Sequence, residues 1–298
     1  MTGGGGGVVL ASYGRGVLVQ PDGTDSAAAT LRCSLKGRNQ RIVCGDRITW
    51  TRQAAHDGIS VESIEPRRNL VERIDARGRA EPVAANIDRL AVVVAPEPAP
   101  DWFLVDRYWA GAELKDIATV LVVNKVDLDV TGVGAEIAAY RNLGLECIET
   151  AAQSGRGIDE LQAAFAGRVT LLVGQSGVGK SSLVNALAPE AAAQTAELTR
   201  DAEGRHTTTT ARRYRLGAGA IVDAPGVRDF APPASLQRAA ERGFIEIHAR
   251  SADCRFNDCH HLTEPGCAVR SAVLSGVVTA RRYESYRRLF RLYEKLLS

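Results

Sequence analysis

The sequence has no long hydrophobic run, no secretory leader and almost no net charge. None of its 298 residues lies in an apolar stretch that approaches the roughly 20 residues of a membrane-spanning helix. Met1 and Thr2 are followed by five glycines, without the basic segment and apolar core of a signal peptide. We therefore expect a cytoplasmic protein with no membrane contact, in which residues 1–7 form a disordered leader.

The net charge of +2 hides two basic regions. Residues 32–52 carry six cations against the single anion Asp46, and residues 266–298 carry seven cations against two glutamates. Positive charge gathered in this way suits a polyanionic partner such as RNA. Two solvated surfaces would give the same pattern, so charge alone leaves both interpretations open.

Residues 8–66 consist of short alternating segments separated by turn signals such as Pro21-Asp-Gly. About five short strands at this spacing predict a small β-barrel. Residues 67–84 are polar and charged, and we interpret them as a linker.

Continuous apolar runs begin after residue 85, and they alternate with helical patterns. Leu90–Ala95, Thr119–Val123 and Val169–Val173 are typical of buried parallel strands. This alternation predicts a doubly wound α/β domain over residues 85–233. Residues 234–298 are predicted to be helical and are interrupted by a group of cysteines and histidines.

The strongest motif is Gly174-Gln-Ser-Gly-Val-Gly-Lys-Ser181, which matches the phosphate-binding pattern GxxxxGK[ST] between a strand and a helix. Backbone N–H groups of such a loop surround phosphates, Lys180 reaches the β- and γ-phosphates, and Ser181 ligates Mg²⁺. An ordinary glycine-rich turn is the alternative. The predicted phosphate-binding residues are Gly174, Gln175, Ser176, Gly177, Val178, Gly179, Lys180, Ser181 and Ser182.

Asp223-Ala-Pro-Gly226 follows a short apolar strand. An aspartate at a strand end near a phosphate loop can hold Mg²⁺, and the Gly226 N–H can detect the γ-phosphate. In isolation this tetrapeptide is often a plain turn.

Asn124-Lys125-Val126-Asp127 predicts guanine specificity. The carboxylate of Asp127 can accept hydrogens from guanine N1 and N2, a pair of donors that adenine lacks. Asn124 can brace neighbouring loops, and the Lys125 stem can cover the ring. We also expect backbone N–H groups near Thr150 and Ala151 to meet guanine O6, although a polar loop ending in a helix cap fits this segment equally.

Gly204–Thr210 lies where a mobile switch segment belongs, between the phosphate loop and Asp223. Thr208 is our candidate for completing the Mg²⁺ shell, and His206 is the candidate for orienting or activating water. His206 and Lys180 are therefore the predicted catalytic residues. Val227 stands where many GTPases place a glutamine, so hydrolysis needs another group or is slow. A solvated threonine-rich loop is the alternative.

The order of these motifs differs from that of most small GTPases, because the guanine motif precedes the phosphate loop. The same sheet forms if the former termini are joined and the chain is opened elsewhere. In this order the γ-phosphate-sensing segment runs directly into the C-terminal region.

Cys254, Cys259, His261 and Cys267 supply three thiolates and one imidazole within 14 residues. In a cytoplasmic chain this spacing predicts tetrahedral zinc rather than disulfides, with coincidental buried cysteines as the alternative. Residues 281–297 form a basic amphipathic helix, whose arginines either contact phosphates or serve a purely structural helix.

Together these motifs resemble the RsgA family of bacterial ribosome small-subunit-dependent GTPases, over nearly the whole chain. The resemblance implies an N-terminal OB-fold barrel, a circularly permuted P-loop GTPase domain and a C-terminal helical zinc-binding domain. It also implies GTP and GDP as ligands with Mg²⁺, one Zn²⁺ per chain, and 16S rRNA and the 30S subunit as partners of a monomer. In the family the catalytic histidine maps onto His206. The family usually has a serine–alanine pair where this chain has Thr150 and Ala151.

The predicted function is GTP hydrolysis in late maturation of the 30S subunit, with release of the protein on hydrolysis. Three rivals remain: an RNA-binding assembly factor without ribosome-stimulated catalysis, a permuted GTPase with another target such as mRNA or the large subunit, and an ATPase.

Overall fold

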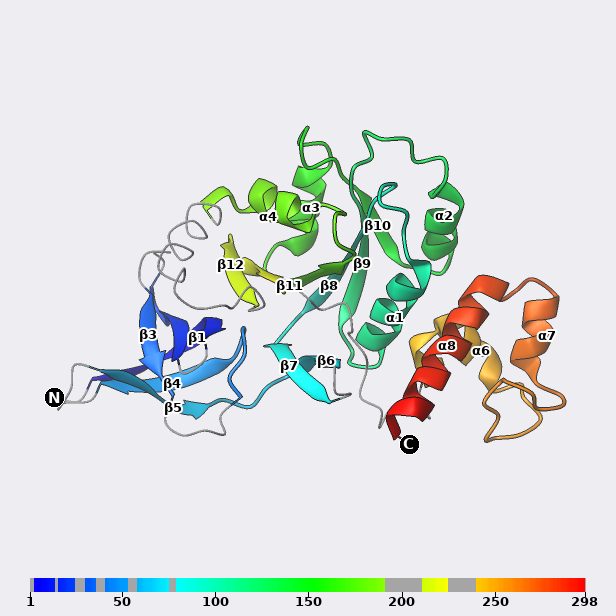
Figure 1. Cartoon of the computed structure of the whole chain (residues 1–298), viewed down its shortest axis with the longest axis horizontal. Helices are drawn as coiled ribbons and strands as arrows, with labels where there is room; N and C mark the ends of the chain where they lie inside the picture. The colour runs from blue at the N-terminus through cyan, green and yellow to red at the C-terminus, as the bar shows by residue number, and fades with distance from the viewer. Residues whose placement is uncertain are drawn as a thin grey trace.

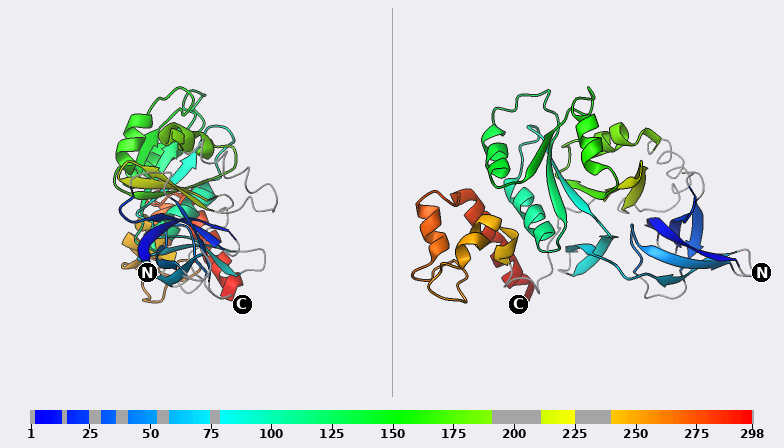
Figure 2. Two further views of the ribbon diagram at one scale, coloured as in Figure 1. Left: turned by 90° about the vertical axis from the view of Figure 1, so that its left-hand side faces the viewer. Right: turned by 180° about the vertical axis from the view of Figure 1, so that it is seen from behind.

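The computed structural model describes residues 3–13, 16–24, 30–35, 41–52, 58–74, 79–190, 211–224 and 240–297. A small barrel, a central sheet covered by helices, and a helical C-terminal module follow one another across the molecule (Figure 1). The view from behind again shows the barrel and the C-terminal module at opposite ends of the molecule (Figure 2, right). Among the helices within these ranges, none has the length and apolar character needed to cross a bilayer.

The N-terminal strands close into a five-stranded barrel. Their order is β1-β2-β3-β5-β4, and β4 pairs back onto β1. Inward-facing aliphatic residues such as Val9, Val19 and Ile48 fill the interior. The predicted OB-type barrel is therefore confirmed, with strands β1 (Gly4–Tyr13), β2 (Gly16–Pro21), β3 (Leu31–Ser34), β4 (Arg47–Arg52) and β5 (Ile59–Ile64).

The glycine run is part of this barrel, and the prediction of a disordered leader is wrong for Gly4–Gly7. These residues lie in β1, opposite β4 from Gly4↔Thr51 to Gly7↔Ile48. A Cβ atom on Gly7 would lie 2.7 Å from the Gln20 carbonyl oxygen of β2. A Cβ on Gly4 would likewise lie 2.9 Å from the Trp50 carbonyl oxygen of β4, so glycine avoids a backbone clash at both positions.

The stretch predicted as a linker contains a second, two-stranded sheet. Strands β6 (Leu70–Ile74) and β7 (Ala80–Ala85) pair antiparallel. Val71 and Ala84 are fully buried and belong to the core of the central domain. The polar residues of this stretch cover a packed apolar side, so the linker interpretation is wrong here.

The central sheet has the order β10-β9-β8-β11-β13-β12, in which all neighbours but β12 are parallel. Alternate residues of β8 face the two cores, with Leu90 and Val92 on one side and Ala91 and Val93 on the other. The strands are β8 (Arg89–Val94), β9 (Ala118–Val123), β10 (Glu146–Glu149), β11 (Val169–Gly174), β12 (Arg212–Leu216) and β13 (Gly219–Asp223).

Helices cover both faces of this sheet, as the doubly wound prediction requires. Helices α1 (Trp102–Glu113) and α2 (Gly134–Asn142) contribute to one core, and α3 (Ile158–Phe165) and α4 (Lys180–Leu187) to the other. At the far edge, β12 pairs with β1 of the barrel, which makes the barrel and the sheet continuous.

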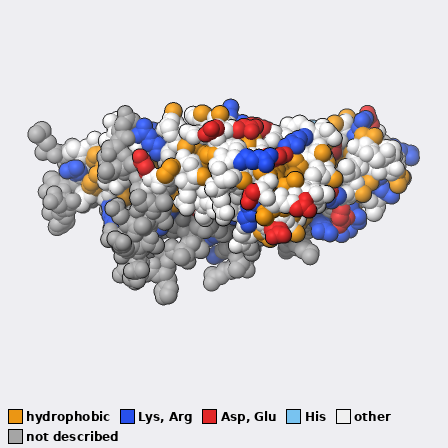
Figure 3. All heavy atoms as spheres, turned by 90° about the horizontal axis from the view of Figure 1, so that it is seen from above, with side chains coloured by type: hydrophobic (Ala, Val, Ile, Leu, Met, Phe, Trp, Pro, Cys, Tyr) orange, Lys and Arg blue, Asp and Glu red, His pale blue; other side chains and the backbone are white. Residues whose placement is uncertain are grey.

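The C-terminal module contains α6 (Ile245–Ser251), α7 (Ala268–Leu274) and α8 (Ala280–Leu297). Phe244, Tyr286, Leu289 and Tyr293 form its core. Figure 3 shows the molecule from above the view of Figure 1. On this face, the described residues present interspersed acidic and basic side chains rather than charges of one sign. The domain boundaries at residues 66, 84 and 233 stay predictions.

Candidate nucleotide site and metal cluster

The predicted nucleotide motifs meet at one edge of the central sheet. The phosphate loop follows β11, Asp223 ends β13, Asn124 follows β9 and Thr150 follows β10. These strands run parallel, so their carboxyl ends share an edge, which is where open α/β sheets bind ligands.

The phosphate loop turns from β11 into α4 with a shape that only glycine permits. A Cβ on Gly174 would lie 2.2 Å from the Val93 carbonyl oxygen, and one on Gly179 would lie 2.3 Å from the Asn124 Nδ2. The Lys180 Nζ donates to the carbonyl oxygens of Gly174 at 2.9 Å and Gln175 at 2.6 Å. The ammonium group thus lies over the loop that is predicted to surround phosphates.

The side chain of Asn124 joins three loops of this edge. It is 1% exposed, and its Nδ2 donates to the Val178 carbonyl oxygen at 2.9 Å. Its Oδ1 accepts from the Thr150 hydroxyl and from the Ala152 N–H, both at 3.2 Å. Asn124 therefore fixes the guanine motif, the phosphate loop and the loop after β10 relative to one another.

The N–H groups of Thr150 and Ala151, near which the contact with guanine O6 is predicted, are both engaged in backbone hydrogen bonds. The Thr150 N–H donates to the Val123 carbonyl oxygen at 2.8 Å, and the Ala151 N–H donates to that of Arg156 at 2.9 Å. Thr150 is fully buried and continues the alternation of β10, which is the signal that could have revealed its inward direction. The next donor along this loop is the half-buried Ala152 N–H.

Lys125 and Asp127 flank the buried Val126. The backbone of Lys125 has a φ of 61°, and its Nζ donates to the Glu97 carbonyl oxygen at 2.9 Å. Asp127 is exposed, and Val126 packs into the core below. This arrangement leaves the Asp127 carboxylate accessible to a ligand.

Asp223 lies within electrostatic reach of Lys180. Burial raises the pKa of Asp223 above its ordinary value, and the positive charges of Lys180 and Arg212 oppose that shift. The nearby phosphate-loop lysine and the strand-end carboxylate form a pair of charges suited to a nucleotide with its magnesium. The predicted residues His206, Thr208 and Gly226 lie outside the described residues.

The loop between β8 and α1 also borders the site, and sequence reasoning missed it. The Gln175 side chain accepts from the Asp101 N–H at 2.8 Å and donates to the Ala99 carbonyl oxygen at 3.3 Å. Pro98 lies against Gly177, where a Cβ would be 3.6 Å from its ring. Its residues match no nucleotide motif, and only the fold brings them to this edge.

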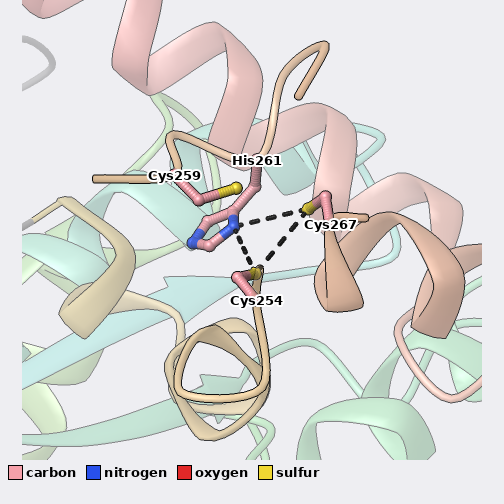
Figure 4. A group of neighbouring side chains, drawn as sticks. All are labelled: Cys254, Cys259, His261 and Cys267. Atoms are coloured by element: carbon pink, nitrogen blue, oxygen red, sulfur yellow. Dashed lines mark hydrogen bonds between the residues drawn. The ribbon is translucent and has the colours of Figure 1, made fainter. Parts of the chain in front are cut away.

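The four predicted metal ligands come together in the C-terminal module (Figure 4). Their ligand atoms all lie within 4.8 Å of one another. The Cys254 and Cys267 sulfurs are 3.9 Å apart, and each is 3.5 Å from the His261 Nδ1. A tetrahedron with Zn–S bonds of about 2.3 Å and a Zn–N bond of about 2.0–2.1 Å has edges of about 3.8 and 3.5 Å. The cluster fits one zinc ion.

Glu241 orients the histidine of this cluster. The His261 Nε2 lies 2.9 Å from the Glu241 Oε2, so the ring donates there and presents its Nδ1 to the sulfurs. The hydrogen bond from His261 lowers the pKa of Glu241, which keeps the carboxylate ionised. No sequence signal pointed to Glu241, because it stands 20 residues before His261.

Comparison with known proteins identifies the family of this chain. The family model of the RsgA GTPase matches residues 64–232. The small ribosomal subunit biogenesis GTPase RsgA of Azotobacter vinelandii is 41% identical over 289 residues, which cover 95% of this chain and 84% of that protein. The protein of the same name from Pseudomonas fluorescens is 40% identical over 288 residues, covering 94% and 83%. This chain belongs to the RsgA GTPase family.

Solved structures support the assignment of the fold. The RsgA-family chain described here is similar to YjeQ from Thermotoga maritima, with a TM-score of 0.70, 28% identity and coverage of 99% of both chains. It is also similar to YloQ, a circularly permuted GTPase, with a TM-score of 0.71, 24% identity and coverage of 98% and 96%. The predicted permutation of the GTPase domain is confirmed, and the protein is a GTPase.

Proposed function

We propose that this GTPase acts in late maturation of the 30S ribosomal subunit, binds 16S rRNA, and leaves the subunit when GTP is hydrolysed. The observation that carries the nucleotide part is the side chain of Asn124, which holds three motif loops at one edge of the sheet. The ribosomal part rests on the relatives named above, which are small ribosomal subunit biogenesis GTPases.

The guanine base is recognised by Asp127, and Lys125 covers the ring. We assign the contact with guanine O6 to the Ala152 N–H. Its present bond to the Asn124 Oδ1 is 3.2 Å, at the long end of the hydrogen-bond range, so a carbonyl acceptor can replace it.

The phosphates lie against the N–H groups of the phosphate loop. Lys180 exchanges its bonds to Gly174 and Gln175 for bonds to the β- and γ-phosphates. Ser181, Thr208 and Asp223 hold Mg²⁺, which neutralises charge on the phosphates. His206 orients the attacking water, and Gly226 detects loss of the γ-phosphate.

The barrel and the C-terminal module provide the contacts with rRNA through their basic regions. The protein works as a cytoplasmic monomer with one structural zinc, held by Cys254, Cys259, His261 and Cys267. Docking on the subunit orders the switch segment and brings His206 to the water. The second candidate is an RNA-binding assembly factor that uses GTP without ribosome-stimulated catalysis.

A single-turnover GTPase assay with purified 30S subunits tests the proposal. We expect 30S subunits to raise the rate by at least about 100-fold, within the range that a positioned general base contributes. The His206→Ala variant keeps GTP affinity and loses most of this stimulation, and Lys180→Ala loses binding and turnover together. Equal rates with 30S subunits, with 50S subunits and without ribosomes, at intact GTP binding, would establish the second candidate instead.

A further inference from the structure

An arginine of the C-terminal helix is buried where the C-terminal module meets the central domain. Arg282 is 1% exposed and Asp106 is fully buried. Arg282 donates two hydrogen bonds to Glu246, at 2.7 and 2.9 Å, and one to Asp106 at 2.9 Å. Its guanidinium carbon lies 4.7 Å from the ring centroids of both Trp109 and Phe244. The planar group thus makes contacts that a lysine cannot reproduce.

The neighbouring Arg281 extends the network to a second helix of the GTPase domain. It pairs with Asp106 at 2.6 Å and with Glu136 of α2 at 2.7 Å. The hydroxyl of Tyr140, also on α2, donates to Asp106. We call these residues the arginine cluster, which comprises Asp106, Glu136, Tyr140, Glu246, Arg281 and Arg282. The cluster joins α1 and α2 of the GTPase domain to α6 and α8 of the C-terminal module.

The segment before α6 packs directly against α1 of the GTPase domain. A Cβ on Gly243, just before α6, would lie 2.7 Å from the Ala110 Cβ and 2.8 Å from its carbonyl oxygen on α1. Glu241, two residues earlier, is the partner of His261 in the metal cluster. Because packed interfaces transmit displacement, a shift of α1 is felt by the segment that orients this ligand.

Helix α1 begins directly at the phosphate loop. Its N-cap residue Asp101 donates its N–H to the Gln175 side chain at 2.8 Å. Asp106 lies five residues further on, about 7.5 Å along the helix axis. Helix α2, in turn, begins at Gly134 after the guanine loop. The two helices that the GTPase domain contributes to the arginine cluster, α1 and α2, therefore start at the edge that holds the nucleotide motifs.

We propose that the arginine cluster couples the nucleotide edge to the C-terminal module, with Gln175 as the positioning residue at the start of α1 and Arg282 as the positioning residue against its middle. Coupling of this kind is reciprocal, so each end must alter the behaviour of the other. The inference requires only that the protein binds a guanine nucleotide, and it does not depend on the ribosomal target.

The first test changes the C-terminal module and measures the rate at which GDP dissociates from the nucleotide edge. Arg282→Lys keeps the buried positive charge and loses the two-pronged contact with Glu246. We expect fluorescent N-methylanthraniloyl-GDP to dissociate about three- to tenfold faster from this variant, the size of effect that coupled residues produce. Arg250→Lys, the same substitution at an exposed position of α6, is the matched control and leaves dissociation unchanged. Metal content and thermal unfolding establish that each variant is folded.

The second test changes the nucleotide edge and measures amide hydrogen exchange in the C-terminal module. It remains possible if the Arg282→Lys variant does not fold. Gln175→Leu removes both contacts with the β8–α1 loop and leaves the module untouched. In the GDP-bound, metal-loaded protein we expect amide hydrogen exchange in α6 and α8 to accelerate about three- to tenfold. The double variant releases GDP no faster than the more affected single variant. Unchanged exchange in α6 and α8, or strictly multiplicative effects in the double variant, would overturn the proposal.

Discussion

The metal cluster and the nucleotide edge are assembled in opposite ways. The four metal ligands stand within 14 residues of sequence, their ligand atoms lie within 4.8 Å of one another, and those of Cys254, His261 and Cys267 are already at tetrahedral distances. The nucleotide edge draws on four strands whose motifs span residues 124 to 223, and its contacts are mostly backbone carbonyl and N–H groups. One site is encoded locally, and the other exists only when the sheet is complete.

This contrast explains which features each site needs for its stability. In the C-terminal module the ion adds to an apolar core built around Phe244, Tyr286 and Leu289, because a module of this size buries little apolar surface by itself. At the nucleotide edge the sheet supplies the scaffold, and a single buried amide, Asn124, sets the relative positions of the loops. Removing metal should therefore disturb one region strongly, whereas changes at the nucleotide edge should alter binding without unfolding.

Metal removal is the change with the largest expected effect. Structural zinc contributes about 10–16 kcal/mol in small zinc domains, so chelation should unfold the C-terminal module. We expect wild-type protein to contain about one zinc per chain. Cys267→Ser should lose it, with fast amide exchange throughout α6, α7 and α8. Metal analysis measures the zinc content per chain, and hydrogen exchange measures the protection of the three helices.

The control for this prediction is Cys147→Ser, a change of the same kind in β10, away from the cluster. It should keep the zinc and the slow exchange of the C-terminal module. If the Cys267→Ser module exchanged as slowly as wild type, the helices would be stable without metal and the contrast between the two sites would fail.

A smaller effect is expected at the base-binding end of the nucleotide edge. Asp127→Asn replaces the acceptor of two guanine hydrogens by an amide, whose oxygen can accept one of them while its NH2 group opposes the other, which should weaken GDP binding by at least about 100-fold. The same amide complements xanthine, so affinity for XDP should rise. Asp129→Asn is the matched control: its carboxylate, in the same loop, accepts from Thr131. Competition titrations measure the affinity of each variant for GDP and XDP. Equal GDP affinity in both variants would show that Asp127 does not contact the base.

Local motifs were predictable from sequence, and long-range contacts were not. The phosphate loop and the Cys/His group can be predicted from the sequence because the residues that act together are neighbours in the chain. The strand formed by Gly4–Gly7 was missed because glycine has low strand propensity, and only the close approach of β2 and β4 makes it favourable here. Glu241 and the partners of Arg282 were missed because folding alone brings them together.

The inward direction of Thr150 shows the limit of motif reasoning at this loop. The motif predicts a contact with guanine O6 near Thr150, and the structure adds that the Thr150 hydroxyl donates to the Asn124 Oδ1. Our proposal assigns the O6 contact to the Ala152 N–H. The motif marks the loop, and the alternation of β10 determines which of its residues point inward.

Thr150→Val gives the smallest and most specific test of this assignment. Valine has the shape of threonine, so the buried site keeps its volume, and the backbone bonds to Val123 and Val126 remain. Only the 3.2 Å bond to the Asn124 Oδ1 is lost. A hydrogen bond of this type contributes about 1 kcal/mol, which corresponds to a roughly fivefold rise in the Kd for GDP.

Thr170→Val supplies the comparison. Thr170 is equally buried, in β11, and within the described part of the chain its hydroxyl has no hydrogen-bond partner. Its replacement should leave GDP affinity unchanged and should not lower thermal stability, because an unpaired buried hydroxyl costs free energy. If Thr150→Val bound GDP as tightly as Thr170→Val, the Thr150 hydroxyl would contribute nothing to the position of Asn124 at the nucleotide edge.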